Sequence, residues 1–241
     1  MSKLNEKVIL VTGGAQGLGK EICRELAEAG AVVIAGDIQE EKGKETVLSL
    51  TQSGGKAYFK RLDLTDEKNV EEVINSIKSE HGRLDGVVNN AGIDFTKTLA
   101  ELSVSEWDAA MNVNLRGPFL TSKFALQVMS EQKSGYIINI ISTAALRAWT
   151  EASVYHASKW GLRGFSQALF TEARRFGVKV TALIAGGMRT PFLLDRFPDL
   201  DQSKLQDPAN VAKKIKFLFE DDTDTVIPEI MVIPQQETSW P

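Results

Sequence analysis

A tyrosine, a lysine and a serine in the second half of the chain could together move a proton. Tyr155 and Lys159 are four residues apart, so on a helix their side chains share one face. A phenol with a pKa of about 10 is a poor base near neutrality, and an ammonium one turn away would lower that pKa. Ser142, thirteen residues before Tyr155, could hold a substrate oxygen. Together these side chains could move a proton while a nicotinamide moves a hydride.

A glycine-rich segment near the N-terminus could bind phosphate. Residues 12–19 read TGGAQGLG and follow a short apolar run that we interpret as a buried strand. Gly13 would allow the tight turn, Gly17 the close approach of a phosphate, and Gly19 the packing of the next helix on the strand. Because the segment follows the first strand, the pattern favours a pyrophosphate site at a helix N-terminus. The alternative is a turn with no ligand.

An acidic residue at the end of the next expected strand bears on the cofactor. Asp37 lies 18 residues after Gly19, where a carboxylate can bind the ribose hydroxyls of NAD. The same charge would repel the 2′-phosphate of NADP, and Gln16, Ile38 and Gln39 supply no cation to offset it. We therefore expect NAD rather than NADP, the alternative for Asp37 being a solvated loop residue.

Short apolar runs alternate with longer amphipathic stretches along the whole chain. Strand, helix and strand in alternation, with nearly continuous apolar strands, is typical of a parallel sheet covered on both faces. The sequence thus predicts an α/β fold: one doubly wound, Rossmann-type sheet of about seven strands. We expect strands at Val8–Val11, Ala31–Ala35, Tyr58–Phe59, Leu84–Val88, Tyr136–Ile141, Val178–Ile184 and Ile230–Ile233, and helices over Leu18–Ala29, Gln39–Ser53, Asp66–Glu80, Ser103–Gln132 (long enough for two, with Pro118 in the first turn of the second), Ala152–Phe176 and Pro208–Glu220.

Composition narrows the classes of function. The 241 residues are 43% hydrophobic and 25% charged with a net charge of −4, which predicts one globular domain over residues 1–241 and argues against nucleic acid as a partner. The sequence has no signal peptide and no apolar stretch of about 20 residues, so we expect no membrane partner. A single cysteine, Cys23, favours a reducing, cytoplasmic setting. The two histidines, His81 and His156, make a metal site improbable, and we interpret both as structural.

Five motifs in the expected order resemble those of the short-chain dehydrogenases/reductases, from about Lys7 to the last strand. They are the glycine segment at 12–19, Asp63-Leu64, the NNAG sequence at 89–92, Asn114 in Asn-Leu-Arg-Gly, and Ser142 with Tyr155 and Lys159. The resemblance implies a catalytic tetrad of Asn114, Ser142, Tyr155 and Lys159. In it Tyr155 is the general acid/base, Lys159 lowers its pKa and binds the nicotinamide ribose, Ser142 orients the substrate oxygen, and Asn114 distorts its helix and helps to hold a water.

The resemblance also implies the binding residues. Asp63-Leu64 would contact the adenine, the NNAG sequence would stabilise the central sheet beside the cofactor, and Thr190 would bind the nicotinamide carboxamide. The residues that we expect to bind the cofactor are Gly13, Gln16, Gly17, Leu18, Gly19, Asp37, Ile38, Asp63, Leu64, Asn90, Ala91, Gly92, Tyr155, Lys159 and Thr190. Those that we expect to bind substrate are Ser142, Ala144, Trp149, Tyr155, Gly186 and Phe192.

One departure from the family pattern follows the sixth strand. The family usually has Pro-Gly there, and this chain has Ala185-Gly186-Gly187, which leaves that turn less stiff. By resemblance, residues 188–206 form a mobile substrate-binding loop. Its apolar side chains suit a neutral alcohol or ketone, whereas Arg147, Arg189 and Arg196 could instead bind a carboxylate or phosphate.

The function that the sequence favours is an NAD-dependent oxidoreductase acting on a secondary alcohol or ketone. One alternative is a 3-oxoacyl thioester reductase, and another is a nucleotide-binding scaffold without catalysis. We also expect a homotetramer or homodimer, because an apolar surplus on the two long helices suggests an interface. The residues of that surplus are Phe119, Phe124, Met129, Trp160, Phe165 and Phe170.

Overall fold

Seven parallel strands form one sheet in a computed structural model that describes residues 3–237. The strand order is β3-β2-β1-β4-β5-β6-β7, and every neighbouring pair is parallel. The predicted doubly wound sheet is confirmed. The strands are β1 (Val8–Thr12), β2 (Val32–Asp37), β3 (Lys56–Arg61), β4 (Gly86–Asn89), β5 (Gly135–Ser142), β6 (Val178–Ala185) and β7 (Glu229–Val232).

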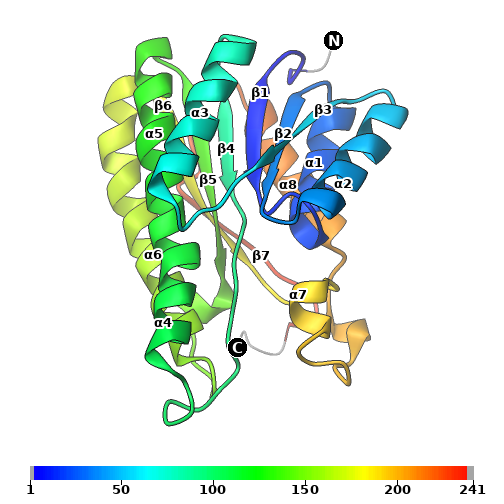
Figure 1. Ribbon diagram of the computed structural model, residues 1–241, viewed down its shortest axis with the longest axis vertical. Coiled ribbons are helices and arrows are strands. Elements are labelled where there is room, and N and C mark those ends of the chain that lie inside the picture. The colour runs from blue at the N-terminus through cyan, green and yellow to red at the C-terminus, as the bar shows by residue number, and fades with distance from the viewer. Residues whose placement is uncertain (1–2, 238–241) are drawn as a thin grey trace.

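Helices cover both faces of the sheet (Figure 1). One layer contains α1, α2 and α8, and the other contains α3, α4, α5 and α6. Each layer buries its own cluster of apolar side chains against the sheet. The helices are α1 (Gly17–Glu28), α2 (Glu40–Gln52), α3 (Glu67–His81), α4 (Val104–Met111), α5 (Gly117–Gln132), α6 (Ser153–Ala173), α7 (Pro191–Leu194) and α8 (Pro208–Glu220).

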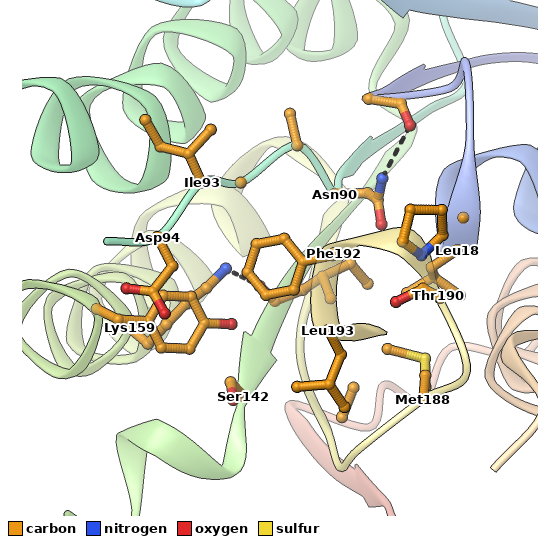
Figure 2. A pocket seen from close by; sticks show the side chains of 18 of the residues that line it. Leu18, Asn90, Ile93, Asp94, Ser142, Lys159, Met188, Thr190, Phe192 and Leu193 are labelled. Carbon is orange, nitrogen blue, oxygen red and sulfur yellow. Dashed lines mark hydrogen bonds between the residues drawn. The ribbon is translucent and has the colours of Figure 1, made fainter. Parts of the chain in front are cut away.

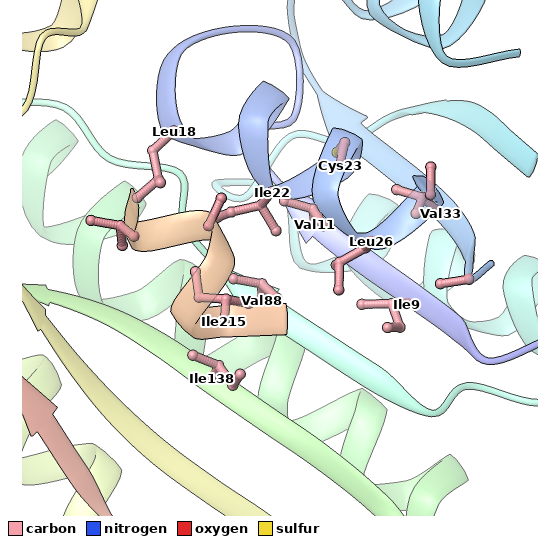
Figure 3. Close-up of a cluster of buried hydrophobic side chains, with 14 of the residues drawn as sticks. Ile9, Val11, Leu18, Ile22, Cys23, Leu26, Val33, Val88, Ile138 and Ile215 are labelled. Atoms are coloured by element: carbon pink, nitrogen blue, oxygen red, sulfur yellow. The ribbon is translucent and has the colours of Figure 1, made fainter. Parts of the chain in front are cut away.

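The helix after β1 shows how the apolar spacing becomes packing. Leu18, Ile22 and Leu26, at steps of four, lie on the buried face of α1 and are at most 6% exposed. They pack with Ile9 of β1 and Ile215 of α8 in the cluster that Figure 3 shows. This packing fixes the direction of α1, and with it the position of the helix N-terminus at the carboxyl edge of β1.

Two helical stretches differ in detail from the sequence prediction. The expected pair over Ser103–Gln132 is α4 and α5 joined through a π-helical turn, Asn112–Arg116, so the helix continues with a widened turn. Pro118 lies in the first turn of α5, as predicted. The helix expected to reach Phe176 ends at Ala173, and a 3₁₀ turn follows.

The apolar surplus on the long helices is smaller than the sequence suggested. Phe124 and Met129 are part of the core, at 6% and 0% exposure, because they pack against the sheet. Phe165 and Phe170 are partly buried against the same core. Phe119 and Trp160 remain 45% and 50% exposed. Only these two of the six residues present a large apolar surface to solvent.

The sequence analysis also made predictions about Cys23, His81, membrane-spanning helices and metal sites. Cys23 is buried and forms no disulfide. His81 ends α3 with its ring 5.1 Å from that of Tyr58, which fits a structural role. Between residues 3 and 237, no helix has the length and hydropathy to cross a bilayer. Over the same range, no three His, Cys, Asp or Glu side chains are grouped to hold a metal ion.

A buried polar network joins the middle of the sheet to two helices. Asn89 Nδ2 donates to Asn139 Oδ1 on the neighbouring β5 at 2.7 Å and to Ser122 Oγ on α5 at 3.2 Å, and its Oδ1 accepts from Thr121. Asn139 in turn donates to Ser166 Oγ on α6 at 2.9 Å. All five side chains are at most 2% exposed. Because buried polar groups are costly without partners, this network specifies how β4, β5, α5 and α6 meet.

We predict that Asn89→Ala lowers the free energy of unfolding by about 2–4 kcal/mol, because it leaves buried partners unpaired and opens a cavity. Urea unfolding followed by circular dichroism measures this change. Asn75→Ala, at an exposed position on α3, is the matched control and should change stability by no more than about 0.5 kcal/mol. Equal effects of the two substitutions would contradict the structural role of the network.

Candidate active site

A cavity of about 900 Å³ opens at the carboxyl edge of the sheet, where the strand order reverses between β1 and β4. Its walls come from the turn after β1, the segments after β4 and β5, the first turns of α6, and the segment after β6 (Figure 2). Open α/β sheets bind their ligands at this kind of edge. Most of the residues predicted for catalysis, cofactor binding or substrate binding line the cavity; the exceptions are Gly19, Asn114 and Ala144.

The glycine turn is shaped for a close ligand. Gly13 and Gly17 have φ angles of +68° and +55°, a conformation that side chains disfavour. A Cβ atom on Gly19 would lie 1.9 Å from the carbonyl oxygen of Gly13, so only glycine fits there. Gly19 therefore packs the helix onto the turn, while Gly13, Gln16, Gly17 and Leu18 face the cavity. A pyrophosphate would meet backbone N–H groups here at the start of α1.

Asp37 lines the cavity at the end of β2 and is only 7% exposed. Its Oδ2 accepts from the Ala15 amide at 3.0 Å and its Oδ1 from the Gln39 amide at 2.9 Å. These bonds hold the carboxylate beside the glycine turn, and each oxygen retains a second lone pair for a ribose hydroxyl. The sequence analysis did not identify one basic residue in this region. Lys42 on α2 donates a hydrogen bond to Gln16 Oε1 at 3.0 Å.

The rest of the expected adenosine side comes from the segment after β3. Asp63 and Leu64 both line the cavity, and Leu64 is 5% exposed. The Asp63 carboxylate accepts from the Thr65 hydroxyl at 2.6 Å and from its amide at 3.0 Å, which lowers the pKa of Asp63. Ile38, also on the lining, is 59% exposed at the rim.

The segment after β4 is tied to the glycine turn. Asn90 Nδ2 donates to the carbonyls of Thr12 at 2.9 Å and Gly13 at 3.2 Å, the first of which Figure 2 shows. Thr12 Oγ1 accepts from the amides of Asn90 and Ala91 at 3.0 and 3.1 Å. The ends of β1 and β4 are thereby held together, with Ala91 and Gly92 on the cavity wall.

Asn114 lies behind that wall, in the π-helical turn, and is fully buried. Its side chain forms two hydrogen bonds with the Ile93 backbone, donating to the carbonyl at 2.7 Å and accepting from the amide at 2.8 Å. It also donates to Ser158 Oγ on α6 at 3.1 Å. Asn114 thus joins the segment after β4 to α6, and it does not face the cavity itself.

Ser142, Tyr155 and Lys159 come together at the end of β5. Ser142 is close enough to the Tyr155 phenol to lower its pKa, and the Lys159 ammonium lies 5.7 Å from the centre of the Tyr155 ring. Lys159 is 4% exposed, and its Nζ donates to the Ile140 carbonyl at 2.9 Å. One turn of α6 and the last residue of β5 therefore present a phenol, a hydroxyl and a buried ammonium to the same part of the cavity.

Burial dominates the ionisation of this group. It raises the pKa of Tyr155 to about 12, against a smaller lowering by Ser142. Burial also lowers the pKa of Lys159 to about 8. The lowering that we expected from the Lys159 ammonium does not contribute to this shift: the groups that lower the pKa of Tyr155 are Ser142 and Arg196, and burial outweighs both. At neutral pH Tyr155 is accordingly a protonated phenol, ready to donate to an oxygen.

The residue beside the tyrosine has a structural role, as predicted. His156 points away from the cavity, its Nδ1 lying 2.7 Å from the Ala144 carbonyl while its Nε2 accepts from the Trp149 amide at 3.2 Å. Ala144 is fully buried and donates its N–H to Ser142 Oγ, so it positions Ser142 instead of lining the cavity as expected for a substrate contact. Trp149 does line the cavity.

The segment after β6 closes the other side. Thr190 is 5% exposed, and its Cβ lies 3.5 Å from where a Cβ on Gly17 would be, which places it against the glycine turn. In the Ala185-Gly186-Gly187 turn, Ala185 still belongs to β6, and the Gly187 amide donates to Glu237 at 3.1 Å. This bond supports the turn where the family usually has proline.

Two of the three arginines proposed for an anionic substrate have acidic partners instead. Arg189 lies 3.7 Å from Asp207, and Arg196 pairs with Asp94. The cavity lining near them is apolar, with Phe192, Leu193, Phe197 and Leu200. This part of the cavity suits a neutral substrate better than an anion.

The residues present fit a nicotinamide dinucleotide. Glycines leave room at the start of α1, Asp37 stands where a ribose would lie, and the lining continues without interruption to Tyr155 and Lys159. A glycine turn at a helix N-terminus, a buried carboxylate and a phenol on one cavity are the arrangement expected of a dinucleotide-dependent oxidoreductase.

Comparison with known proteins gives the family. The short chain dehydrogenase family model matches residues 7–201, and the chain belongs to this family. It is 34% identical over 237 residues to a cyclopentanol dehydrogenase from Comamonas sp. (strain NCIMB 9872), covering 94% of each chain. It is 31% identical to the 3-oxoacyl-(acyl-carrier-protein) reductase FabG of Thermotoga maritima, covering 96% of this chain and 97% of that one. The structure matches an alcohol dehydrogenase from the archaeon Thermococcus sibiricus, complexed with 5-hydroxy-NADP, with a TM-score of 0.89 and 26% identity, covering 97% of this chain and 98% of that one.

Because the Lys159 ammonium is buried, we predict that it lowers the free energy of unfolding at neutral pH although the proposed function requires it. Between pH 8 and 10.5 the folded protein loses this proton while the unfolded chain keeps it, so the penalty of burying the charge disappears as pH rises. Lys159→Met should therefore be more stable than the wild type at pH 7, by about 1–3 kcal/mol, with the difference shrinking by pH 9.5. Urea unfolding at both pH values measures this.

Lys20→Met, at an exposed position of α1, is the control and should show no pH-dependent difference from the wild type. A Lys159→Met variant that is no more stable at pH 7 than the wild type would contradict a costly buried charge.

Proposed function

We propose that the protein is an NAD(H)-dependent oxidoreductase that interconverts secondary alcohols and ketones. The observation that carries the proposal is that Ser142, Tyr155 and the buried Lys159 line one part of a cavity that continues to the glycine turn and Asp37. The similarity to a cyclopentanol dehydrogenase supports an alcohol or ketone as substrate.

The glycine turn, Asp37, Asp63 and Thr190 would hold the dinucleotide, which supplies or accepts the hydride when bound. Ser142 then holds the substrate oxygen by a hydrogen bond. In ketone reduction Tyr155 donates its phenolic proton to that oxygen, and in alcohol oxidation it must first lose that proton to act as base. Because the pKa of Tyr155 is raised, the protonated form prevails at neutral pH and reduction needs no prior ionisation.

Lys159 has two parts in this scheme. Its buried ammonium stabilises the phenolate that forms as the proton leaves Tyr155. Its hydrogen bond to the Ile140 carbonyl holds Nζ at the side of the cavity where a nicotinamide ribose would lie. Asn114 supports both by fixing α6 against the segment after β4.

The cofactor proposal rests on the charge of Asp37. A buried carboxylate at the ribose position repels a 2′-phosphate. Two observations favour NADP instead, namely Lys42 beside Gln16 and the NADP analogue bound by the Thermococcus sibiricus enzyme. We favour NAD because Asp37 lines the cavity directly, whereas Lys42 is bonded to Gln16 at the exposed side.

A 3-oxoacyl thioester reductase is the second candidate, favoured by the similarity to FabG. That activity is usually linked to NADPH and needs a basic surface for a carrier protein, so Asp37 and the net charge of −4 weigh against it. A scaffold without catalysis is less favoured, because the Ser142, Tyr155 and Lys159 geometry is intact.

Three further expectations concern the substrate-binding loop, the oligomeric state and the cellular compartment. Residues 188–206 would move to admit substrate, since they form one wall of the cavity. Phe119 and Trp160 would pack in a dimer or tetramer interface of α5 and α6. The buried, unpaired Cys23 is compatible with a reducing, cytoplasmic compartment.

Tyr155→Phe should lower kcat by about 10²–10⁴-fold on a panel of secondary alcohols and ketones, because it removes the proton that is transferred. NADH absorbance measures the rate. Tyr58→Phe removes a hydroxyl on the exposed β3 strand and should retain wild-type turnover. Full turnover in Tyr155→Phe would disprove the mechanism.

The wild type should bind NADH at least about tenfold more tightly than NADPH, because Asp37 repels the 2′-phosphate. Asp37→Ser should weaken NADH binding and reduce this preference, as measured by nucleotide fluorescence titration. Lys42→Ala should leave the preference unchanged. Tighter NADPH binding by the wild type, lost in Lys42→Ala, would show that Lys42 and not Asp37 selects the cofactor.

A further inference from the structure

One carboxylate in the cavity is not used by the mechanism above. Asp94 follows β4 by five residues and lines the cavity together with Tyr155 and Phe192. Its side chain is 8% exposed. Oδ2 accepts from Arg196 Nη1, whereas the buried Oδ1 has no hydrogen-bond partner within residues 3–237. A buried carboxylate oxygen without a donor is unusual, because such oxygens are normally hydrogen-bonded.

The position of Asp94 is fixed by a short stack of side chains. The Arg196 guanidinium lies over the Phe192 ring at 4.0 Å, and its Nε donates to the Phe192 carbonyl at 2.8 Å. The Phe192 ring lies 5.8 Å from the Tyr155 ring. Figure 2 shows Asp94 on the same side of the cavity as Lys159, next to Phe192. Arg196 and Phe192 thus link Asp94 to Tyr155, and all four residues line the same cavity.

We propose that Asp94 is a specificity-determining residue whose Oδ1 accepts a hydrogen bond from a second hydroxyl group of the substrate. The substrate class is then a diol, or the matching hydroxyketone, with the second hydroxyl close to the carbon that is oxidised or reduced. This inference rests on the proposed function, because it requires the reacting oxygen to lie at Ser142 and Tyr155.

The local charges favour a neutral donor over an ion. An ammonium substrate would lie beside two cations, Arg196 and Lys159, while Asp94 is already paired with Arg196. A carboxylate substrate would face the Asp94 oxygen directly. A hydroxyl group satisfies Oδ1 without adding charge to the cavity. The apolar lining by Phe192 and Leu193 would cover the carbon skeleton.

The test compares 1,2-cyclohexanediol with cyclohexanol, each with NAD and with NADP. The wild type should oxidise the diol with a kcat/KM at least about tenfold higher, since the lone alcohol leaves Oδ1 without a donor. In Asp94→Leu this ratio should fall to near one. Leucine is close to aspartate in size and has no donor or acceptor, whereas the NH₂ group of an asparagine could still donate to the hydroxyl oxygen.

Arg196→Met is the matched control, because it breaks the same ion pair and keeps the carboxylate. It should lower the rates on both alcohols together and leave the ratio high. A wild-type ratio near one, or a ratio that Asp94→Leu does not change, would overturn the proposal and leave Asp94 as a partner of Arg196 only.

Binding separates this inference from the proposed function. Trp149 lines the cavity, so its fluorescence can report binding of each alcohol to the enzyme with NAD or NADP bound. Diol binding at least about tenfold tighter than cyclohexanol binding, lost in Asp94→Leu, supports the hydroxyl site even if neither alcohol is oxidised. Turnover of both alcohols with no difference in binding or rate would keep the proposed function and refute the hydroxyl site.

Discussion

The hydrogen bonds between Asn90 and the end of β1 hold the two halves of the site together. At this point the strand order reverses, so β1 and β4 are neighbours although the chain passes through β2 and β3 between them. Asn90 binds the carbonyls of Thr12 and Gly13, and Thr12 binds the backbone after β4 in return. The same segment continues to Ile93, which Asn114 joins to Ser158 on α6. One connected set of bonds thus relates the glycine turn to the helix that carries Tyr155 and Lys159.

Burying the Lys159 ammonium beside Tyr155 costs folding stability, and the proposed proton transfer depends on that burial. Lys159 is buried with its ammonium bonded to one carbonyl, and burial lowers its pKa while raising that of Tyr155. Each shift disfavours the charged form, so both groups hold their charge only at an energetic cost. A phenolate formed during reaction relieves part of this cost, because it gives the buried ammonium a counter-charge. The energetic cost of charging these two buried groups is the physical basis of the proton transfer that we propose.

Much of the fold was predictable because its signals are local. Apolar runs such as Val8–Val11 and the spacing of Leu18, Ile22 and Leu26 indicate strand and helix without tertiary information. The tetrad was recognised from motif order, and the structure brings Ser142, Tyr155 and Lys159 together while placing Asn114 behind the wall. The π-helical turn at Asn114 matches the helix distortion that the family resemblance implied.

What the sequence could not show depends on contacts between distant residues. Asp94 and Arg196 are separated by 102 positions, and no spacing rule joins them. Phe124 and Met129 looked like surface residues because helix periodicity does not reveal how many faces a helix buries. The tyrosine pKa was misjudged because the ammonium is visible in the sequence and the desolvation is not.

The pH dependence of the two reaction directions tests the central claim that Tyr155 is a protonated donor at neutral pH. Reduction consumes one proton, so the ratio of kcat/KM for oxidation to kcat/KM for reduction must change about tenfold per pH unit. The measurement shows whether it is the oxidation rate or the reduction rate that changes with pH. With cofactor saturating, kcat/KM for the alcohol should rise toward tenfold per unit between pH 6 and 8, while kcat/KM for the ketone stays constant. A constant oxidation rate with reduction falling over that range would mean that the group is already ionised, and would contradict the account.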